Sequence, residues 1–275
     1  MFRSTLIALL SIPCALIAQT NGQTSTAYFQ QEMNYKIDVS LNDQSHTLTG
    51  NLDLKYKNNS PNELTFIYFH IWANAYKDNS SAFAKQKANN STDLSFQFAK
   101  EDDRGYLDNL QFKVDGVPTK ITPDPKNIDI IRIDLPKPLK SGAQVTITTP
   151  FNVKLPYTFS RGGHVEQAYQ ITQWYPKPAV YDREGWHPMP YLDQGEFYSE
   201  YGNFDVTISL PQNYIVAATG ELDNAAERTF LDGLAAAKNP PLDSFPESSK
   251  TIKTIRYTAS KVDRKSTRLN SSHVD

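Results

Sequence analysis

Apolar and polar residues alternate along many segments of this chain, and this period of two most limits the folds open to it. The pattern is clearest in Tyr35–Leu41 and in Leu48–Tyr56, where nearly every second residue is apolar. Because successive side chains of a strand point to opposite faces, each segment predicts a half-buried strand. The turn-forming sequence Asn42-Asp43-Gln44 lies between them, so the sequence predicts a β-hairpin.

Further strand patterns follow, separated by clusters rich in Gly, Pro, Asn and Asp. Leu64–Trp72 is apolar at odd and even positions alike, which predicts a strand buried on both faces. Helical patterns are limited to Ala82–Ala88 and Asn224–Lys238. The sequence therefore predicts an all-β sandwich or open curved sheet with one or two short helices. The remaining predicted strands are 107–114, 128–135, 144–153, 204–210, 214–219 and 253–259.

Aromatic residues are concentrated in Tyr169–Leu210, which holds six tyrosines, four prolines and two of the three tryptophans. Proline fixes the backbone, and aromatic side chains bury a large area while keeping a polar group at one end. This composition predicts a rigid, aromatic-walled loop between strands, at an interior wall or at one side of a cleft.

Net charge excludes some classes of partner. With 28 basic and 30 acidic residues the chain carries a net charge of −2, so nothing indicates nucleic acid or an anionic membrane as a ligand.

The first 18 residues predict a signal peptide. Arg3 is basic, Leu6–Ile17 is apolar, and Ala18 suits a cleavage site. The apolar run is shorter than the ~20 residues that a spanning helix needs, so no transmembrane segment is expected. Cleavage removes Cys14, the single cysteine, and leaves no residue for a disulfide, a thiolate metal site or a cysteine nucleophile. We therefore expect an exported bacterial protein, periplasmic or extracellular.

The last residues differ from the rest of the chain. Asp263–His273 reads DRKSTRLNSSH, a polar run that resembles the in-frame translation of a sequencing-library adapter. The alternative is a native basic tail, since termini are often polar and mobile. We expect residues 263–275 to be a disordered, adapter-derived tail, with the native protein continuing differently beyond Val262.

Short catalytic motifs are missing from the sequence: it has no HExxH, GxSxG, Walker loop or GxGxxG. No two of the five histidines have the spacing of a zinc pair. His70 is expected to be a hydrogen-bonded core residue, and His187 to anchor a loop. An acidic set in the aromatic stretch suits a glycosidase carboxylate pair, a calcium ion, or simple solvation, while the aromatics suit sugar stacking. The set comprises Asp182, Glu184, Asp193, Glu196 and Glu200.

Three segments, taken in order, are similar to the N-terminal domain of aminopeptidase-N-type zinc metallopeptidases, the gluzincin family that also contains leukotriene hydrolase. The opening strands Tyr35–Ile71 resemble the family's entry strand and hairpin. Ile171–Tyr191 resembles its threonine-glutamine strand and proline-rich aromatic segment, in the form of secreted bacterial members. Gly202–Leu222 resembles its closing pair of strands. The resemblance covers about Ala27–Ser260.

The resemblance implies a curved, saddle-like antiparallel β-domain over residues 27–260. In the family this domain packs on a C-terminal, thermolysin-like catalytic domain that carries HExxH, a further glutamate ligand and a GxMEN strand. None of these elements occurs in this sequence. The resemblance therefore implies a missing catalytic domain that holds the zinc, with no cofactor, metal ligand or catalytic residue in this chain.

The resemblance also implies a substrate-binding position. In the family a glutamine or glutamate that binds the substrate's amino group lies two positions after the glutamine of the threonine-glutamine pair. Here the pair is Thr172-Gln173, so that position is Tyr175. A neutral phenol cannot pair with an ammonium as a carboxylate does. Three alternatives follow. Gln173, or a carboxylate such as Glu196, binds the amino group; the parent enzyme is not a strict aminopeptidase; or Gln173 and Tyr175 are ordinary polar residues of a strand.

Two functions follow as hypotheses. The first is a non-catalytic N-terminal domain of an exported zinc metallopeptidase that hydrolyses peptides. The second is a stand-alone secreted β-sandwich that binds peptide or carbohydrate through its aromatic loop. Without its catalytic domain, the chain is expected to leave a face of Trp174, Tyr175, Trp186 and Tyr191 partly uncovered, and therefore to self-associate.

Overall fold

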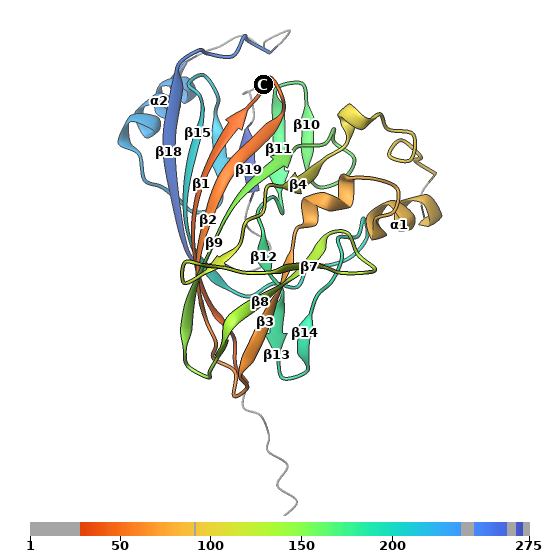
Figure 1. Cartoon of the computed structure of the whole chain (residues 1–275). Coiled ribbons are helices and arrows are strands. Elements are labelled where there is room, and N and C mark those ends of the chain that lie inside the picture. The colour runs from red at the N-terminus through yellow and green to blue at the C-terminus, as the bar shows by residue number, and fades with distance from the viewer. Residues whose placement is uncertain (1–27, 91, 238–244, 263–267, 272–275) are drawn as a thin grey trace, which may run out of the picture.

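The computed structural model describes residues 28–90, 92–237, 245–262 and 268–271 (Figure 1). The predicted signal peptide and most of the predicted tail lie outside these ranges. The predicted all-β class is confirmed: strands dominate, and the long ones curve through the molecule as an open structure (Figure 1). Within the described ranges, no helix is long and apolar enough to cross a membrane.

The largest sheet has nine strands. Its order is β17-β18-β15-β1-β2-β9-β5-β6, and β4 also pairs with β9. The strands are β1 (Glu32–Asn42), β2 (Thr47–Lys57), β4 (Tyr106–Asp108), β5 (Lys113–Val114), β6 (Val117–Pro118), β9 (Gln144–Lys154), β15 (Gly202–Pro211), β17 (Glu221–Leu222) and β18 (Ile252–Val262).

The predicted hairpin is β1 and β2, paired antiparallel with Ile37 opposite Leu52. Burial alternates strictly along β1, as the period-two pattern predicted. On its other side β1 pairs with β15 in parallel, with Ile37 opposite Val206. This one parallel pair differs from the antiparallel pairing that was expected, because the two strands are joined by a long crossover rather than a turn.

A four-stranded sheet packs against the large one. Its order is β12-β3-β8-β7, and it comprises β3 (Leu64–His70), β7 (Ile121–Pro123), β8 (Ile130–Leu139) and β12 (Lys177–Pro178). Leu54 of β2, Phe151 of β9 and Ile67 of β3 belong to one buried cluster, so the main core lies between the two sheets. β3 is buried less completely than predicted, because Thr65 is exposed and Phe66 and Tyr68 are half-buried.

The third sheet contains part of the predicted tail. Its order is β10-β11-β19-β16, with β10 (Gly163–Val165), β11 (Ala168–Thr172), β16 (Val216–Ala218) and β19 (Arg268–Ser271). Disorder was expected for residues 268–271, yet they form a strand between β11 and β16. Strand pairing uses main-chain groups that every non-proline residue carries, so a polar sequence does not prevent it. A separate two-stranded hairpin consists of β13 (Val180–Asp182) and β14 (Gly185–His187).

The two predicted helices are present. α1 (Ala82–Asn90) follows the short 3-10 helix η1 (Trp72–Tyr76), and a second buried cluster around Phe83 and Phe96 lies beneath them. A further 3-10 helix, η2, spans Glu101–Asp103. α2 (Ala225–Ala236) lies beside the β18 edge of the large sheet (Figure 1).

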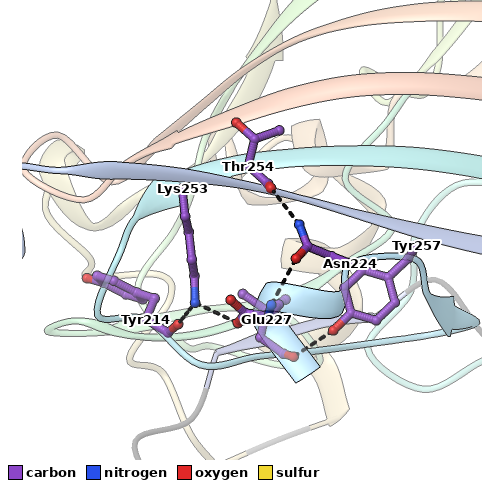
Figure 2. Close-up of polar contacts among 7 residues, drawn as sticks. Tyr214, Asn224, Glu227, Lys253, Thr254 and Tyr257 are labelled. Carbon is purple, nitrogen blue, oxygen red and sulfur yellow. Dashed lines mark hydrogen bonds and ion pairs between the residues drawn. The ribbon is translucent and has the colours of Figure 1, made fainter. Parts of the chain in front are cut away.

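Polar contacts fasten α2 to β18 (Figure 2). Asn224 caps the helix by accepting a 2.8 Å hydrogen bond from the Glu227 backbone N–H, and its Nδ2 donates to the Thr254 carbonyl of β18 at 3.2 Å. Lys253 Nζ lies 2.6 Å from Glu227 Oε1 and also donates to the Tyr214 carbonyl. The side chains of Lys253 and Glu227 are 12% and 5% exposed, so this ion pair is largely removed from water.

Asn58 is the centre of a buried network at the end of β2. Its side chain is fully buried, and Nδ2 donates to the carbonyls of Asn62 at 2.7 Å and Leu139 at 2.9 Å. Its Oδ1 accepts from the Ser60 backbone N–H, the Ser60 hydroxyl and Gln31 Nε2. One side chain therefore joins the turn at 58–62 to the end of β8 and to the segment before β1.

Two histidine rings stack at the opposite end of the β1–β2 hairpin. The rings of His46 and His164 lie 3.6 Å apart between centroids and 14° from parallel, and His46 Nδ1 is 2.7 Å from the Tyr169 hydroxyl. Desolvation lowers the pKa of both imidazoles below the ordinary 6.5, and that of His164, which also faces His46, falls to about 4. Lys154 lowers both pKa values further, while Asp43 opposes the shift at His46, and Asp103 and the Glu166 carbonyl oppose it at His164.

We expect this pair to make the protein acid-sensitive. The folded state favours neutral imidazoles, whereas the unfolded chain takes up protons near pH 6.5, so the stabilisation is complete above that pH and is lost as pH falls toward 4. Since both rings are half-exposed, water screens the effect, and we expect a loss of about 1–2 kcal/mol. Denaturant unfolding of the wild type and of His164→Gln between pH 4 and pH 7.5 measures this. The stability advantage of the wild type should shrink as pH falls, and parallel pH curves would contradict the expectation.

Candidate functional site

The aromatic stretch 169–210 divides into a buried and an accessible half. It begins in β11, passes through the short strands β12, β13 and β14, and ends in β15. Residues 174–180 are all buried, whereas residues 181–187 are half-buried or exposed. Residues 174–180 therefore belong to the core, whereas the following hairpin is accessible to solvent.

Gln173, one of the two predicted substrate-binding residues, lies just beyond β11. Its backbone φ is +55°, a left-handed conformation that ends the strand and turns the chain inward. The half-buried Gln173 borders a cavity of only about 20 Å³ beside Trp174. A cavity of that size holds about one water molecule, so it offers no room for a peptide side chain.

Tyr175, the other predicted substrate-binding residue, lies in the core. Its side chain is 2% exposed and packs edge-on against Tyr35, with ring centroids 5.6 Å apart. Phe204 and Trp174 complete its aromatic surroundings. These are the contacts of a packing residue, and the substrate-binding role of Gln173 and Tyr175 stays a prediction.

The expectation of an uncovered aromatic face is wrong. Trp174, Tyr175 and Tyr191 are buried within this chain, and Trp186 is half-buried against the main core. Their partners are other aromatic side chains, such as Tyr76, whose hydroxyl lies 2.7 Å from that of Tyr191. The face that was expected to require another domain is covered by the chain's own residues, which removes the reason to expect self-association.

The predicted acidic set separates into two groups. Asp193 accepts a hydrogen bond from the Ser160 hydroxyl at 2.9 Å, and Glu196 is exposed. Asp182, Glu184 and Glu200 instead border one pocket of about 450 Å³. We call it the Glu200 pocket; its walls are residues 28–30, residues 180 and 182–184 of β13 and the following turn, and residues 198–201.

Asp182 is fully engaged in hydrogen bonds. Its Oδ1 lies 2.7 Å from His187 Nε2 and accepts the Glu184 backbone N–H, while Oδ2 accepts the Tyr198 hydroxyl at 3.1 Å. Desolvation opposes ionisation, but these hydrogen bonds outweigh it and lower the pKa of Asp182. The contact also confirms His187 as a loop-anchoring residue, as predicted.

Glu200 has the opposite environment. Its side chain is 6% exposed, and the hydrogen bond that it accepts, from the Gln31 backbone N–H, is long at 3.4 Å. Burial raises the pKa of Glu200 to about 7, and the neighbouring negative charge of Asp182 adds to the shift. Next to it, the Ser199 hydroxyl is buried without a hydrogen-bond partner among the described residues. A buried carboxylate and an unsatisfied hydroxyl thus border the same pocket.

Some residues that line this pocket were not predicted from the sequence. Tyr28, Phe29 and Gln30 precede the first strand and carry no motif, and only their position against the β13–β14 hairpin makes them wall residues. Nothing in the sequence distinguishes Ser199 from other loop serines. The one sequence signal for this wall of the pocket was an acidic residue, Glu200, between two tyrosines, Tyr198 and Tyr201.

The histidines do not assemble a metal site in the described part of the chain. Among the described residues, no group of three or more His, Cys, Asp or Glu side chains is placed to hold an ion. His70 is fully buried, its Nε2 accepts the Met189 backbone N–H at 3.1 Å, and burial lowers its pKa to about 3. The predicted core role of His70 is confirmed, and the described residues do not fit a zinc ion.

Solved structures of an M1 zinc metallopeptidase from Deinococcus radiodurans are similar to this chain. One, bound to a Tyr-Ser-Ala substrate, is 10% identical with a TM-score of 0.43, and the match covers 83% of this chain and 39% of that chain. Another is 12% identical with a TM-score of 0.41, covering 84% and 38%. No family model and no curated protein matches the sequence. The chain spans about 39% of the length of the first of these structures.

Proposed function

We propose that this chain is a non-catalytic N-terminal domain of an exported zinc metallopeptidase. The order of the three family-like segments carries the proposal. Its first and third segments supply β1 and β15, which pair in register at the centre of the largest sheet. Two of the three family-like segments therefore contain strands at the centre of the fold.

We propose that the zinc chemistry and the scaffold belong to different domains of the enzyme. Peptide hydrolysis by such an enzyme uses a zinc-activated water with a glutamate as general base. The sequence has no HExxH, and the described residues do not fit the metal. Zinc and the base would belong to a catalytic domain encoded beyond Val262, and this chain would supply a rigid β-scaffold beside it.

The purified chain is expected to have no zinc-dependent peptidase activity. The measurement is hydrolysis of aminoacyl p-nitroanilides with added zinc, with and without a chelator. A matched positive control is the same chain extended through the native reading frame, which should hydrolyse these substrates and lose activity with the chelator. Chelator-sensitive turnover by the present chain would contradict the proposal, as would a native stop codon soon after Val262.

The Glu200 pocket favours a second candidate, a stand-alone secreted β-sandwich that binds peptide or carbohydrate through its aromatic loop. It is lined by four aromatic residues and lies on the accessible half of the stretch. The native gene separates the two candidates, because a downstream HExxH on a predicted helix supports the first and a nearby stop codon supports the second.

A further inference from the structure

The Glu200 pocket holds a buried carboxyl group that forms no ion pair with a basic side chain among the described residues. Three carboxylates, those of Asp182, Glu184 and Glu200, line it beside one guanidinium, that of Arg183. Arg183 is 69% exposed and lies 4.0 Å from Glu184, so it faces solvent at the rim. No ion pair of Glu200 occurs among the described residues, although buried carboxylates are ordinarily paired.

The other walls of the pocket suit an organic cation. Phe29, Tyr28, Tyr198 and Tyr201 line it, and the three tyrosines are 41–82% exposed. Aromatic faces attract ammonium and guanidinium groups at distances up to about 6 Å. The Ser199 hydroxyl, which lacks a partner among the described residues, is a further acceptor for an N–H donor.

The size of the pocket fits a side chain rather than a bare ion. Its volume of about 450 Å³ lies within the roughly 300–1,000 Å³ typical of small-molecule sites. A metal ion would instead need several converging oxygen ligands. Both Asp182 oxygens already accept hydrogen bonds from His187, Tyr198 and the Glu184 backbone. The Glu184 carboxylate is 70% exposed and lies 4.0 Å from Arg183, so Glu200 is the buried carboxylate available to a ligand.

We propose that the Glu200 pocket binds the basic side chain of a peptide, with Glu200 accepting hydrogen bonds from the cation and the surrounding aromatic rings packing on its aliphatic stem. The residues that form this site all belong to the described part of this chain, so the proposal does not depend on a catalytic domain. Failure of the binding test therefore leaves the peptidase proposal intact, and the peptidase assay does not decide the binding.

The direct test uses N-acetyl-arginine methylamide, which lacks both a free amino group and a carboxylate. Binding to the intact chain is followed by NMR chemical-shift changes at pH 8. We expect millimolar affinity, and at least about tenfold weaker binding of the isosteric, uncharged citrulline derivative, because charge-assisted hydrogen bonds are roughly twice as strong as neutral ones. Equal affinity for the two probes would overturn the proposal.

Variants locate the site. Glu200→Gln keeps the shape and removes a desolvated charge, so the fold is expected to persist, and arginine-probe affinity should fall by about tenfold. Glu196→Gln is the matched control, since it changes the same residue type at an exposed position outside the pocket. Equal losses of arginine-probe affinity in the two variants would overturn the assignment. So would an unchanged affinity in a Glu200→Gln variant whose thermal unfolding shows that it is folded.

The pH dependence gives an independent readout. With the pKa of Glu200 raised to about 7 by burial, the ionised form becomes dominant only above neutrality. The other groups that face the pocket are Asp182 with its partner His187, Arg183, Glu184 and the tyrosine hydroxyls. We expect wild-type affinity for the arginine probe to rise by up to about tenfold from pH 6 to pH 8. Glu200→Gln should lose this rise, and an unchanged rise in that variant would contradict the role of Glu200.

Discussion

Replacing Asn58 with alanine is expected to lower the free energy of unfolding by about 3–5 kcal/mol, because several buried polar groups lose their partners at once. The carbonyls of Asn62 and Leu139 lose their donor, and the Ser60 hydroxyl loses its acceptor. None of these groups gains access to water, since the Asn58 side chain is fully buried. Urea unfolding followed by tryptophan fluorescence measures the effect.

The neighbouring residue provides the control for Asn58. Asn59 is exposed and donates a single side-chain hydrogen bond, to the Gln30 carbonyl at 3.0 Å. Asn59→Ala is therefore expected to lower stability by less than about 1 kcal/mol. Asn58→Asp, which keeps an acceptor but loses the Nδ2 donor and buries a charge, should be as damaging as Asn58→Ala. Similar stabilities of Asn58→Ala and Asn59→Ala would show that the network contributes little.

Replacing Lys253 with methionine is expected to destabilise the protein by about 3–5 kcal/mol, the loss typical when one partner of a buried ion pair is removed. Methionine keeps the aliphatic part of the side chain, so the effect reports the loss of the ammonium group, which forms the ion pair with Glu227 and donates to the Tyr214 carbonyl. The Glu227 side chain is only 5% exposed, and in the variant its carboxylate would have lost its cation (Figure 2). Because the pair connects α2 to β18, hydrogen exchange in the helix should accelerate most.

Two further variants test whether the Lys253 effect comes from an orphaned charge. Lys253→Met combined with Glu227→Gln removes both charges and should recover much of the lost stability. Lys57→Met breaks an ion pair with Glu32 at 3.1 Å, but those side chains are 37% and 49% exposed, so we expect less than about 1 kcal/mol. If the double variant is as unstable as Lys253→Met, the charge explanation fails.

Local sequence pattern predicted most long strands and both helices. The period of two in β1 and β2 is visible because one face of each strand is buried and the other meets solvent. Strands of two residues, such as β12, have no period to detect. The parallel pairing of β1 with β15 joins segments about 170 residues apart, and no local pattern encodes such a partner.

The candidate site was less predictable than the fold. The aromatic stretch was found, but composition alone did not separate residues that pack inward, such as Tyr175, from those at the surface, such as Tyr198. The acidic residues were likewise found as a set. Only the structure distinguishes Asp182, with every oxygen engaged, from Glu200, which lacks a cation among the described residues.

The parallel register of β1 and β15 constrains how the chain reaches its folded state. A ribosome synthesises Glu32–Asn42 long before Gly202–Pro211, so the middle strand of the largest sheet keeps one unpaired edge during most of translation. Unpaired edges bind other strands, including those of neighbouring nascent chains. We expect such a nascent polypeptide to benefit from holdase chaperones that cover this edge, because the largest sheet is completed only after β15 has emerged.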